Sequence, residues 1–257
     1  MLLAIDAGNT NTVFAVFAGE RPGGSWRLRT EGRRSADEYA GFLHQVFALS
    51  GVDFKQIRAV IVSSVVPEAD FHIADLCGKY LGVKPVFVSK DNVPVELKVE
   101  RPGDVGADRL VNAVAVKAHY TAPAIVIDFG TATTFDVIDA DGAYAGGVIA
   151  PGIDLSVEAL HRAASKLPKI SVEKPGKVIG GSTVQAMRSG IYYGYAGLID
   201  GVVRGIRGEM GCKDVLVLAT GGLAGLFAEG SDVIERVDRE LTLKGLYEIY
   251  KSLSDEA

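Results

Sequence analysis

Short apolar runs alternate along this chain with segments in which apolar residues recur at helical spacing. The runs near 1–17, 60–66, 125–138 and 215–219 are rich in β-branched residues and short enough for buried strands. Behind Ser35, apolar side chains at 39, 42, 43, 46 and 47 predict a helix with one buried face, ending near Gly51. Another helical pattern begins at Gly106. Three more cover about 155–167, 183–210 and 241–253. Strands that alternate with helices predict an α/β protein.

Local signals set several boundaries of these elements. Ser35 to Glu38 and Ser182 to Gln185 both have the spacing of a capping box at a helix start. Pro67 should end the strand before it, and Asp141-Gly142 predicts a tight hairpin turn. Residues 26–30 and 85–89 read as further strands, and the alternation over 95–99 predicts an edge strand.

The beginning of the chain is repeated in its middle. An offset of 122 residues places Asp6 on Asp128, Gly8 on Gly130 and Thr12 on Thr134. This period is far too long for a solenoid of stacked repeats. It predicts two related α/β halves, residues 1–119 and 120–257, whose mixed sheets face a central cleft.

Composition and charge narrow the class of protein. A net charge of −5 over 257 residues argues against a general nucleic-acid or anionic-membrane surface. Cys77 and Cys212 lie far apart without metal-ligand spacing, so neither a disulfide framework nor a zinc site is expected. The start of the chain lacks the features of a secretory signal, and no apolar run approaches about 18 residues. We therefore expect a cytoplasmic protein with neither nucleic-acid nor membrane partners.

The repeated segments have the chemistry of a phosphate and cation site. In each, a strand ends in an aspartate, and a glycine follows two residues later with threonines beyond it. Glycine lets backbone N–H groups approach an anion, and one carboxylate with phosphate oxygens and water suits Mg²⁺. Either aspartate alone could instead cap a tight turn, but the repetition favours function. Neither GxxxxGK[ST] nor GxGxxG occurs, which leaves P-loop and dinucleotide-binding motifs without support.

Two other sites carry candidate chemistry. Asp108 and Arg109 follow a glycine at a helix start, pairing a potential base with an anion-binding side chain. The alternative explanation for Asp108 is an exposed aspartate in the first turn of a helix, where the helix dipole favours a negative charge. Gly221 and Gly222 follow a strand and could admit the adenine of ATP against the backbone, or they could form an ordinary strand-end turn.

The helix expected over 183–210 contains glycine at 190, 194, 197, 201 and 205. Glycine in a helix interior costs about 1 kcal/mol relative to alanine, so a compensating interaction is expected. Close packing against another helix would provide it, either within the chain or across a dimer.

Taken together, these motifs resemble the type III pantothenate kinases. The matching segments, which cover nearly the whole chain in order, are DAGNTNT at 6–12, VSSVVP at 62–67, GADRLVNAVA at 106–115, IDFGTATTFDVI at 127–138, GGVIAPGI at 146–153, TVQAMRSGIYYGYAGLIDG at 183–201, ATGGLA at 219–224 and LTLKGL at 241–246. Each motif alone would indicate only the wider superfamily of acetate and sugar kinases, Hsp70 and actin.

The resemblance implies two RNase H-like (actin-like ATPase) domains and an ATP-dependent kinase. Its reaction would convert pantothenate to 4'-phosphopantothenate, the first step of coenzyme A synthesis, with Mg²⁺, a monovalent cation (K⁺ or NH₄⁺) and a homodimer. Asp108 would be the general base, Asp6 would lie near Mg²⁺, and Asp128 would bind the monovalent cation. The ATP contacts implied are Asp6, Ala7, Gly8, Asn9, Thr10, Asn11, Thr12, Val13 and Thr131, and the pantothenate contacts are Gly106, Ala107, Asp108, Arg109 and Thr183, the last from the partner subunit.

The chain departs from the family pattern at two positions, and two other functions remain open. Val99 stands where many members carry a pocket tyrosine, and Ser182 replaces an asparagine before Thr183. One alternative is a kinase with another small hydroxy or carboxylic acid as acceptor. The other is a nucleotide-binding regulator without turnover. A regulator would be expected to have lost an acidic position, yet Asp6, Asp108 and Asp128 are all present.

Overall fold

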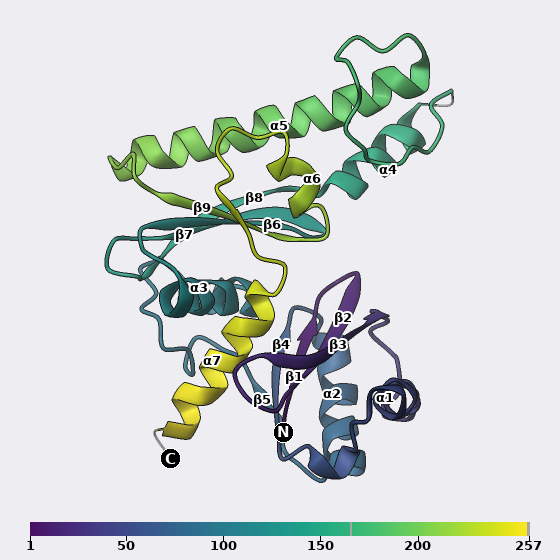
Figure 1. Cartoon of the computed structure of the whole chain (residues 1–257), viewed down its shortest axis with the longest axis vertical. Helices are drawn as coiled ribbons and strands as arrows, with labels where there is room; N and C mark the ends of the chain where they lie inside the picture. Colours follow the sequence, from purple (N-terminus) through teal and green to yellow (C-terminus); the bar gives the residue numbers. More distant parts are fainter. Residues whose placement is uncertain (165, 256–257) are drawn as a thin grey trace. The chain divides into compact units, whose positions relative to one another are not determined.

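The computed structural model describes residues 1–164 and 166–255, which form two compact units, each built around its own five-stranded sheet (Figure 1). The first unit comprises Met1–Tyr120 together with the segment that begins at Leu241, and the second comprises Thr121–Glu240. This division differs from the expected one, 1–119 and 120–257, because the last helix belongs to the first unit.

The first unit is a mixed sheet covered by helices. Its strands are β1 (Leu2–Ala7), β2 (Asn11–Phe17), β3 (Pro22–Arg29), β4 (Ala59–Ser64) and β5 (Val86–Phe87), in the order β3-β2-β1-β4-β5. Strands β1 to β3 are antiparallel neighbours, whereas β4 and β5 run parallel to β1. The helices are α1 (Ala36–Ser50), α2 (Pro67–Leu76), α3 (Ala107–His119) and α7 (Leu241–Asp255), with short helical turns η1 (Phe54–Gln56), η2 (Cys77–Leu81) and η3 (Pro102–Asp104). Apolar faces of α1 and α2 pack with β1, β2 and β4 into one core.

The second unit repeats this plan. Its strands are β6 (Ala124–Phe129), β7 (Ala132–Ile138), β8 (Tyr144–Pro151), β9 (Leu216–Gly221) and β10 (Arg236–Val237). Their order, β8-β7-β6-β9-β10, is that of the first sheet, with the same antiparallel and parallel pairings. The helices are α4 (Ile153–Ala163), α5 (Thr183–Met210) and α6 (Ala224–Ala228), and a core of their apolar side chains packs against the sheet.

Strand by strand, the duplication predicted from the sequence is confirmed, with one correction of register. Strands β1 and β6 begin 122 residues apart, at Leu2 and Ala124, but β2 and β7 begin 121 apart, at Asn11 and Ala132. The first hairpin loop is therefore one residue longer than the second. Thr12, opposite Ala7, consequently corresponds to Thr133, opposite Phe129, and not to Thr134.

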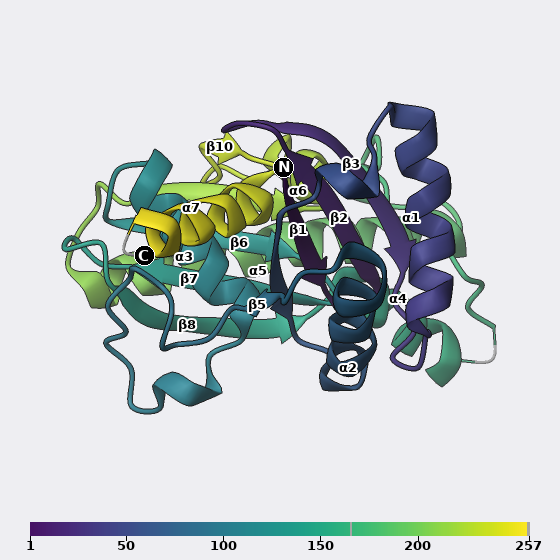
Figure 2. The same cartoon turned by 90° about the horizontal axis from the view of Figure 1, so that it is seen from below.

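Helices α3 and α7 pack side by side, although more than 120 residues separate them in the chain (Figure 2). A Cβ on Gly245 would lie 2.1 Å from the carbonyl oxygen of Val111, so the two backbones approach as closely as glycine allows. The Thr242 hydroxyl donates to Asn112 Oδ1 at 2.9 Å. Helix α7 therefore supports the helix that carries Asp108.

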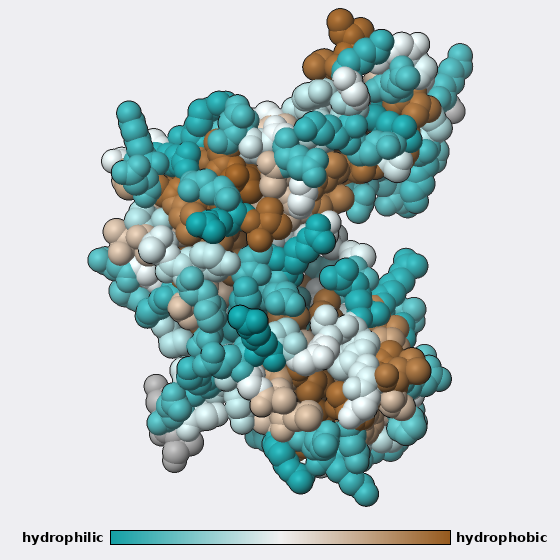
Figure 3. Space-filling model, viewed as in Figure 1, coloured by the Kyte–Doolittle hydropathy of each residue, from teal (hydrophilic) through white to brown (hydrophobic). Residues whose placement is uncertain are grey.

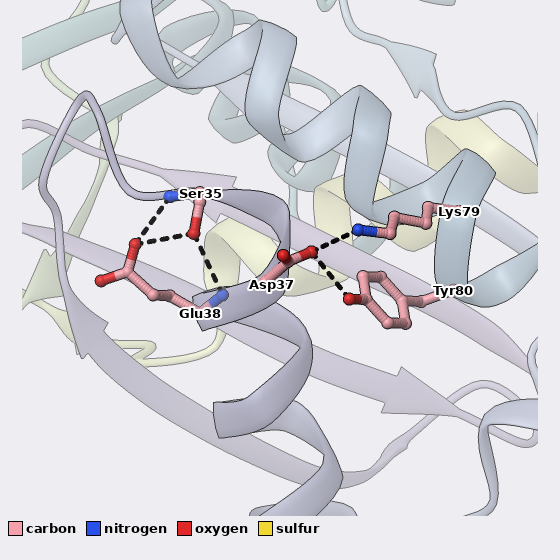
Figure 4. A network of polar contacts seen from close by, with 5 residues as sticks. All are labelled: Ser35, Asp37, Glu38, Lys79 and Tyr80. Atoms are coloured by element: carbon pink, nitrogen blue, oxygen red, sulfur yellow. Dashed lines mark hydrogen bonds and ion pairs between the residues drawn. The ribbon is translucent and has the colours of Figure 1, made fainter.

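The start of α1 confirms the first predicted capping box. Ser35 Oγ accepts from the Glu38 N–H, and the Glu38 carboxylate accepts from the Ser35 N–H at 2.9 Å (Figure 4). Asp37, the residue before Glu38, accepts from Lys79 Nζ at 2.6 Å and from the Tyr80 hydroxyl at 2.7 Å, which connects α1 to η2 (Figure 4). These exposed contacts order the helix start more than they stabilise the fold, because solvent screens such pairs.

Three other predictions are corrected. Residues 95–99 form no strand, only an isolated bridge at Leu97, because β5 is two residues long and offers little edge to pair with. Helix α4 ends at Ala163, before the expected Leu167. At the start of α5, Ser182 accepts from the Gln185 N–H as predicted, but the Gln185 side chain accepts from the Gly181 N–H instead of closing the box on Ser182.

The glycines of α5 lie on its exposed face. A Cβ at 190, 194, 197, 201 or 205 would meet nothing within 4 Å in the described part of the chain. Packing against another helix of the second unit is therefore excluded for the described residues of that unit.

Candidate active site

The first candidate loop connects β1 to β2. Asp6 lies one residue before the end of β1, opposite Ser63 of the parallel strand β4. The Gly8 N–H donates to the Asn11 carbonyl at 3.1 Å and closes the turn, while Asn9 and Thr10 are exposed at its tip. Ser63 is fully buried and its hydroxyl has no partner among the described residues. A ligand at this strand end would meet a carboxylate and an exposed main-chain turn.

Asp108 lies at the same end of β1 and β4 as Asp6. Its Oδ1 accepts from the Arg109 N–H at 2.9 Å and would be 2.6 Å from a Cβ on Gly106. That same Cβ would lie 3.6 Å from Val65, whose N–H donates to the Ala7 carbonyl at 3.1 Å. The Asp108 carboxylate therefore folds back over Gly106, and a side chain there would displace it. The predicted base and the first loop are neighbours within one unit.

The surroundings of Asp108 change its basicity. Burial raises the pKa of the Asp108 carboxyl above its ordinary value, although the N–H and the positive charge of Arg109 act in the opposite direction. Because the raised pKa reflects a desolvated carboxylate, Asp108 is a stronger base than an exposed aspartate. A higher pKa favours acceptance of a hydroxyl proton, although a step in which the proton moves late does not demand it.

The second candidate loop connects β6 to β7 and is enclosed by glycines. Asp128 is paired with Thr220 of β9, and the next residue, Gly221, has a φ of 89°. A Cβ on Gly221 would lie 2.6 Å from the Phe129 carbonyl oxygen and 2.7 Å from Asp128 Oδ1. Gly222 donates its N–H to the Phe129 carbonyl at 3.3 Å. The predicted strand-end glycines thus fit directly against the loop of Asp128.

Gly152 supports the same loop from the other side and was not singled out from the sequence. A Cβ on Gly152 would lie 2.0 Å from the Thr131 carbonyl oxygen, so its backbone packs directly on the loop. It also precedes α4, whose N-terminus therefore lies next to Thr131. Thr131 is exposed in this loop, and Gly152 and Gly221 pack against the loop. Together they form a second turn that an anion can reach.

Thr183 is not part of this second loop. It is exposed at the first position of α5. Tyr195, whose hydroxyl lies 3.1 Å from the Gly152 carbonyl oxygen, follows 12 residues later on the helix. At a rise of 1.5 Å per residue, Thr183 is about 18 Å along the axis from that contact. A cavity of about 480 Å³ lies at this end of α5, lined by Glu173, Lys174, Pro175, Gly176, Lys177, Gly180, Gln185 and Arg188.

Another residue not expected from the sequence lies against the first loop. Thr30 follows β3, its hydroxyl donates to the Gly8 carbonyl at 2.6 Å, and its N–H donates to the Thr10 carbonyl at 3.0 Å. A polar residue at the end of a predicted strand was the available signal for Thr30.

Val99, the first departure from the family pattern, is half-buried in a segment without helix or strand.

The donor set is consistent with a cation that is shared with a bound phosphate. Within residues 1–164 and 166–255, no three His, Cys, Asp or Glu side chains gather into a metal site. Magnesium is commonly held by one or two carboxylates with phosphate oxygens and water, so a single strand-end aspartate fits it.

No helix within residues 1–164 and 166–255 has the length and hydropathy to cross a membrane.

Two halves with one sheet order, each with an acidic strand end and a glycine-containing hairpin, define the actin-like ATPase fold. Among solved structures, the ROK hexokinase from Thermus thermophilus superimposes with a TM-score of 0.51 at 13% sequence identity, over 99% of both chains.

A family model described as type III pantothenate kinase matches residues 2–205. The type III pantothenate kinases of Paramagnetospirillum magneticum and Rhodospirillum rubrum are 54% and 51% identical to this chain over 98% of its length, and the matches cover 97% and 98% of those proteins. The chain belongs to the type III pantothenate kinase family. The fold class, the enzyme class and pantothenate phosphorylation, all expected from the resemblance, are thereby confirmed.

Proposed function

We propose that Asp108 is the general base of the kinase reaction. The terminal hydroxyl of pantothenate attacks the γ-phosphorus of ATP, the bond to the β-phosphate oxygen breaks, and ADP leaves. The hydroxyl proton passes to the Asp108 carboxylate. The observation that carries this proposal is the desolvated Asp108 carboxylate, oriented by the Arg109 N–H at the strand end that holds Asp6. Little basicity is needed when the proton moves late in phosphoryl transfer.

The ATP contacts are assigned by unit. In the first unit they are the loop Asp6, Ala7, Gly8, Asn9, Thr10, Asn11, Thr12 and Val13. In the second they are Thr131, Gly221 and Gly222. The exposed tips of both hairpins and the close-packed glycines behind the second support these roles. Thr12 is fully buried, so its side chain contributes to the shape of the loop instead of touching phosphate.

Asp6 would hold Mg²⁺, which when bound neutralises phosphate charge, and Asp128 would hold the monovalent cation. The pairing of Asp128 with Thr220, together with the Asp128 oxygen 2.7 Å from a Cβ position on Gly221, supports a compact oxygen-rich site there.

Replacing K⁺ and NH₄⁺ with Na⁺ at constant ionic strength is expected to lower kcat about 10-fold or more, because oxygen ligands spaced for a larger ion coordinate Na⁺ poorly. The measurement is the initial rate in each chloride salt. An equal rate in all three salts would remove this role from Asp128.

For pantothenate, the contacts proposed are Gly106, Ala107, Asp108, Arg109 and Thr183. A guanidinium binds a carboxylate through two parallel hydrogen bonds, which suits Arg109 to the pantothenate carboxylate. Thr183 would act from the partner subunit of a homodimer.

Two features support such a dimer. The exposed glycines of α5 present backbone to which a second helix could pack closely, which would compensate for their cost in helix stability. The loop before α5 adds an apolar area: Val178 and Ile179 are 61% and 83% exposed, and brown atoms gather over that loop in Figure 3.

Gly197→Leu is expected to convert the dimer to a monomer, because a large side chain in the middle of the glycine face blocks helix contact. Light scattering after gel filtration measures the mass, and circular dichroism checks that α5 stays helical. Glu209→Leu, at an exposed position about a third of a turn around the helix from Gly197, is the matched control and should remain dimeric. A dimeric Gly197→Leu protein would place the interface elsewhere.

The test of the proposed function is a coupled ADP-release assay with ATP, Mg²⁺ and K⁺, run with and without pantothenate. We expect pantothenate-dependent release and a phosphopantothenate product in mass spectrometry. ATP binding without pantothenate-dependent release would indicate another acceptor.

A further inference from the structure

We propose that Thr30 is a positioning residue that holds the β1–β2 loop in its ATP-binding shape. Thr30 makes three hydrogen bonds to this loop: its hydroxyl donates to the Gly8 carbonyl at 2.6 Å, its N–H donates to the Thr10 carbonyl at 3.0 Å, and its hydroxyl lies 2.9 Å from that of Thr12. The contacts therefore reach the beginning, the tip and the end of the turn. The inference rests on the proposed role of residues 6–13 in binding phosphate.

The directions of these bonds follow from counting hydrogens. A threonine hydroxyl has one hydrogen, and that of Thr30 is used on the Gly8 carbonyl. In the pair with Thr12, Thr30 must therefore accept, and Thr12 must donate. Because Thr12 is fully buried, this bond fixes its hydroxyl inside the unit. Both hydroxyls are then committed to the loop's own structure.

The orientation of the Gly8 carbonyl decides what the loop offers to a ligand. In a trans peptide, the carbonyl oxygen and the following N–H point in opposite directions. Thr30 attracts the Gly8 oxygen to its own side and so turns the Asn9 N–H to the other side, at the exposed tip of the loop. A backbone N–H presented in a tight turn is the donor that phosphate oxygens use. Loss of the Thr30 hydroxyl would release this peptide to rotate.

The second unit provides an independent comparison at the same position. Strands β3 and β8 end 122 residues apart, at Arg29 and Pro151, so Thr30 corresponds to Gly152. Gly152 supports the second hairpin by direct backbone packing, since a Cβ there would lie 2.0 Å from the Thr131 carbonyl oxygen. The residue after the third strand thus supports the hairpin loop in both halves. In the first half, where the loop is one residue longer, a side chain makes the connection.

Thr30→Val removes the hydroxyl at nearly constant volume and is the first test. We expect the KM for ATP, and the Kd for ADP measured by calorimetry, to rise about 10-fold, equivalent to about 1.4 kcal/mol, while kcat stays within about threefold. Thr30→Ser keeps the hydroxyl and should restore both constants to within about twofold of wild type, because the same hydrogen bond can form. Ser252→Ala, which removes another partly buried hydroxyl bonded to a carbonyl in this unit, is the matched control and should change neither constant.

The outcomes separate this inference from the proposed function. If Thr30→Val lowers the melting temperature but leaves the KM and Kd unchanged, while Asp6→Asn raises them, Thr30 is merely structural and the inference is overturned. If Asp6→Asn also leaves both unchanged, the loop does not bind ATP and both proposals fail. Should Thr30→Val not fold, Thr30→Cys, which keeps a small side chain with a weaker donor, must show the rise in KM for the inference to stand.

Discussion

Replacing Asp108 with asparagine is expected to lower kcat about 1,000-fold, within the range that a general base contributes, while the Kd for ATP stays within about twofold of wild type. Asparagine keeps an oxygen to accept from the Arg109 N–H, so the start of α3 should retain its geometry, but it cannot take the hydroxyl proton. ADP release measures turnover and calorimetry measures nucleotide binding. A kcat near that of wild type would remove Asp108 from the mechanism.

The same variant makes a prediction about stability whose sign follows from the pKa. Burial raises the pKa of Asp108, so the folded state binds its proton more tightly than the unfolded state does. The contribution of this group to stability is therefore present below the unfolded pKa and is lost as pH rises through the folded pKa. Near neutral pH, Asp108→Asn should melt at the same temperature as wild type or higher. A lower melting temperature at neutral pH would contradict the assignment of burial as the dominant effect.

Gly221→Ala is expected to disrupt the second hairpin loop and to weaken ATP binding at least 100-fold. The new Cβ would lie 2.6 Å from the Phe129 carbonyl oxygen and 2.7 Å from Asp128 Oδ1, and the φ of 89° is itself strained for alanine. Because the obstructing atoms are mainly backbone, the loop must move instead of a flexible side chain. A lower melting temperature and a higher Kd for ADP are the expected results.

The neighbouring glycine is the control for the fold. A Cβ on Gly222 would meet nothing within 4 Å, and its φ is not positive, so Gly222→Ala should leave the melting temperature unchanged. If it nevertheless raises the Kd for ADP, the added methyl occupies space that the nucleotide uses. Equal melting temperatures for both alanine variants would contradict the close packing described for Gly221.

Residues whose signal is local were predictable. Asp6 and Asp128 follow β-prone runs and lie two residues before a glycine. The repeat showed that the two positions are equivalent, without knowledge of the sheets. Ser35 and Glu38 form the capping box that their spacing indicates, because a helix start depends on only four residues. Asp108 was placed correctly at a helix start for the same reason.

Features that depend on contacts between distant segments were not predictable. Thr30 and Gly152 matter because of the loops they touch, 22 residues and about 20 residues away along the chain. The strand-end position of Thr30 and the glycine-rich motif around Gly152 do not indicate which loop each one touches. The expected edge strand at 95–99 has the right alternation but a partner strand too short to pair with. The match of Thr12 to Thr134 was wrong because a constant offset cannot allow for one extra loop residue.

The return of α7 to the first unit has a consequence for the order of events during synthesis. Residues 121–240 are contiguous, so the second unit can fold as soon as they leave the ribosome. The first unit begins earlier but lacks the partner of α3 until residues 241–255 have been made. The helix that carries the base is therefore held in place only after α7 has been made. A chain released before Leu241 would contain every proposed catalytic and ATP-binding residue and still lack a supported Asp108, so catalytic competence depends on the synthesis of α7.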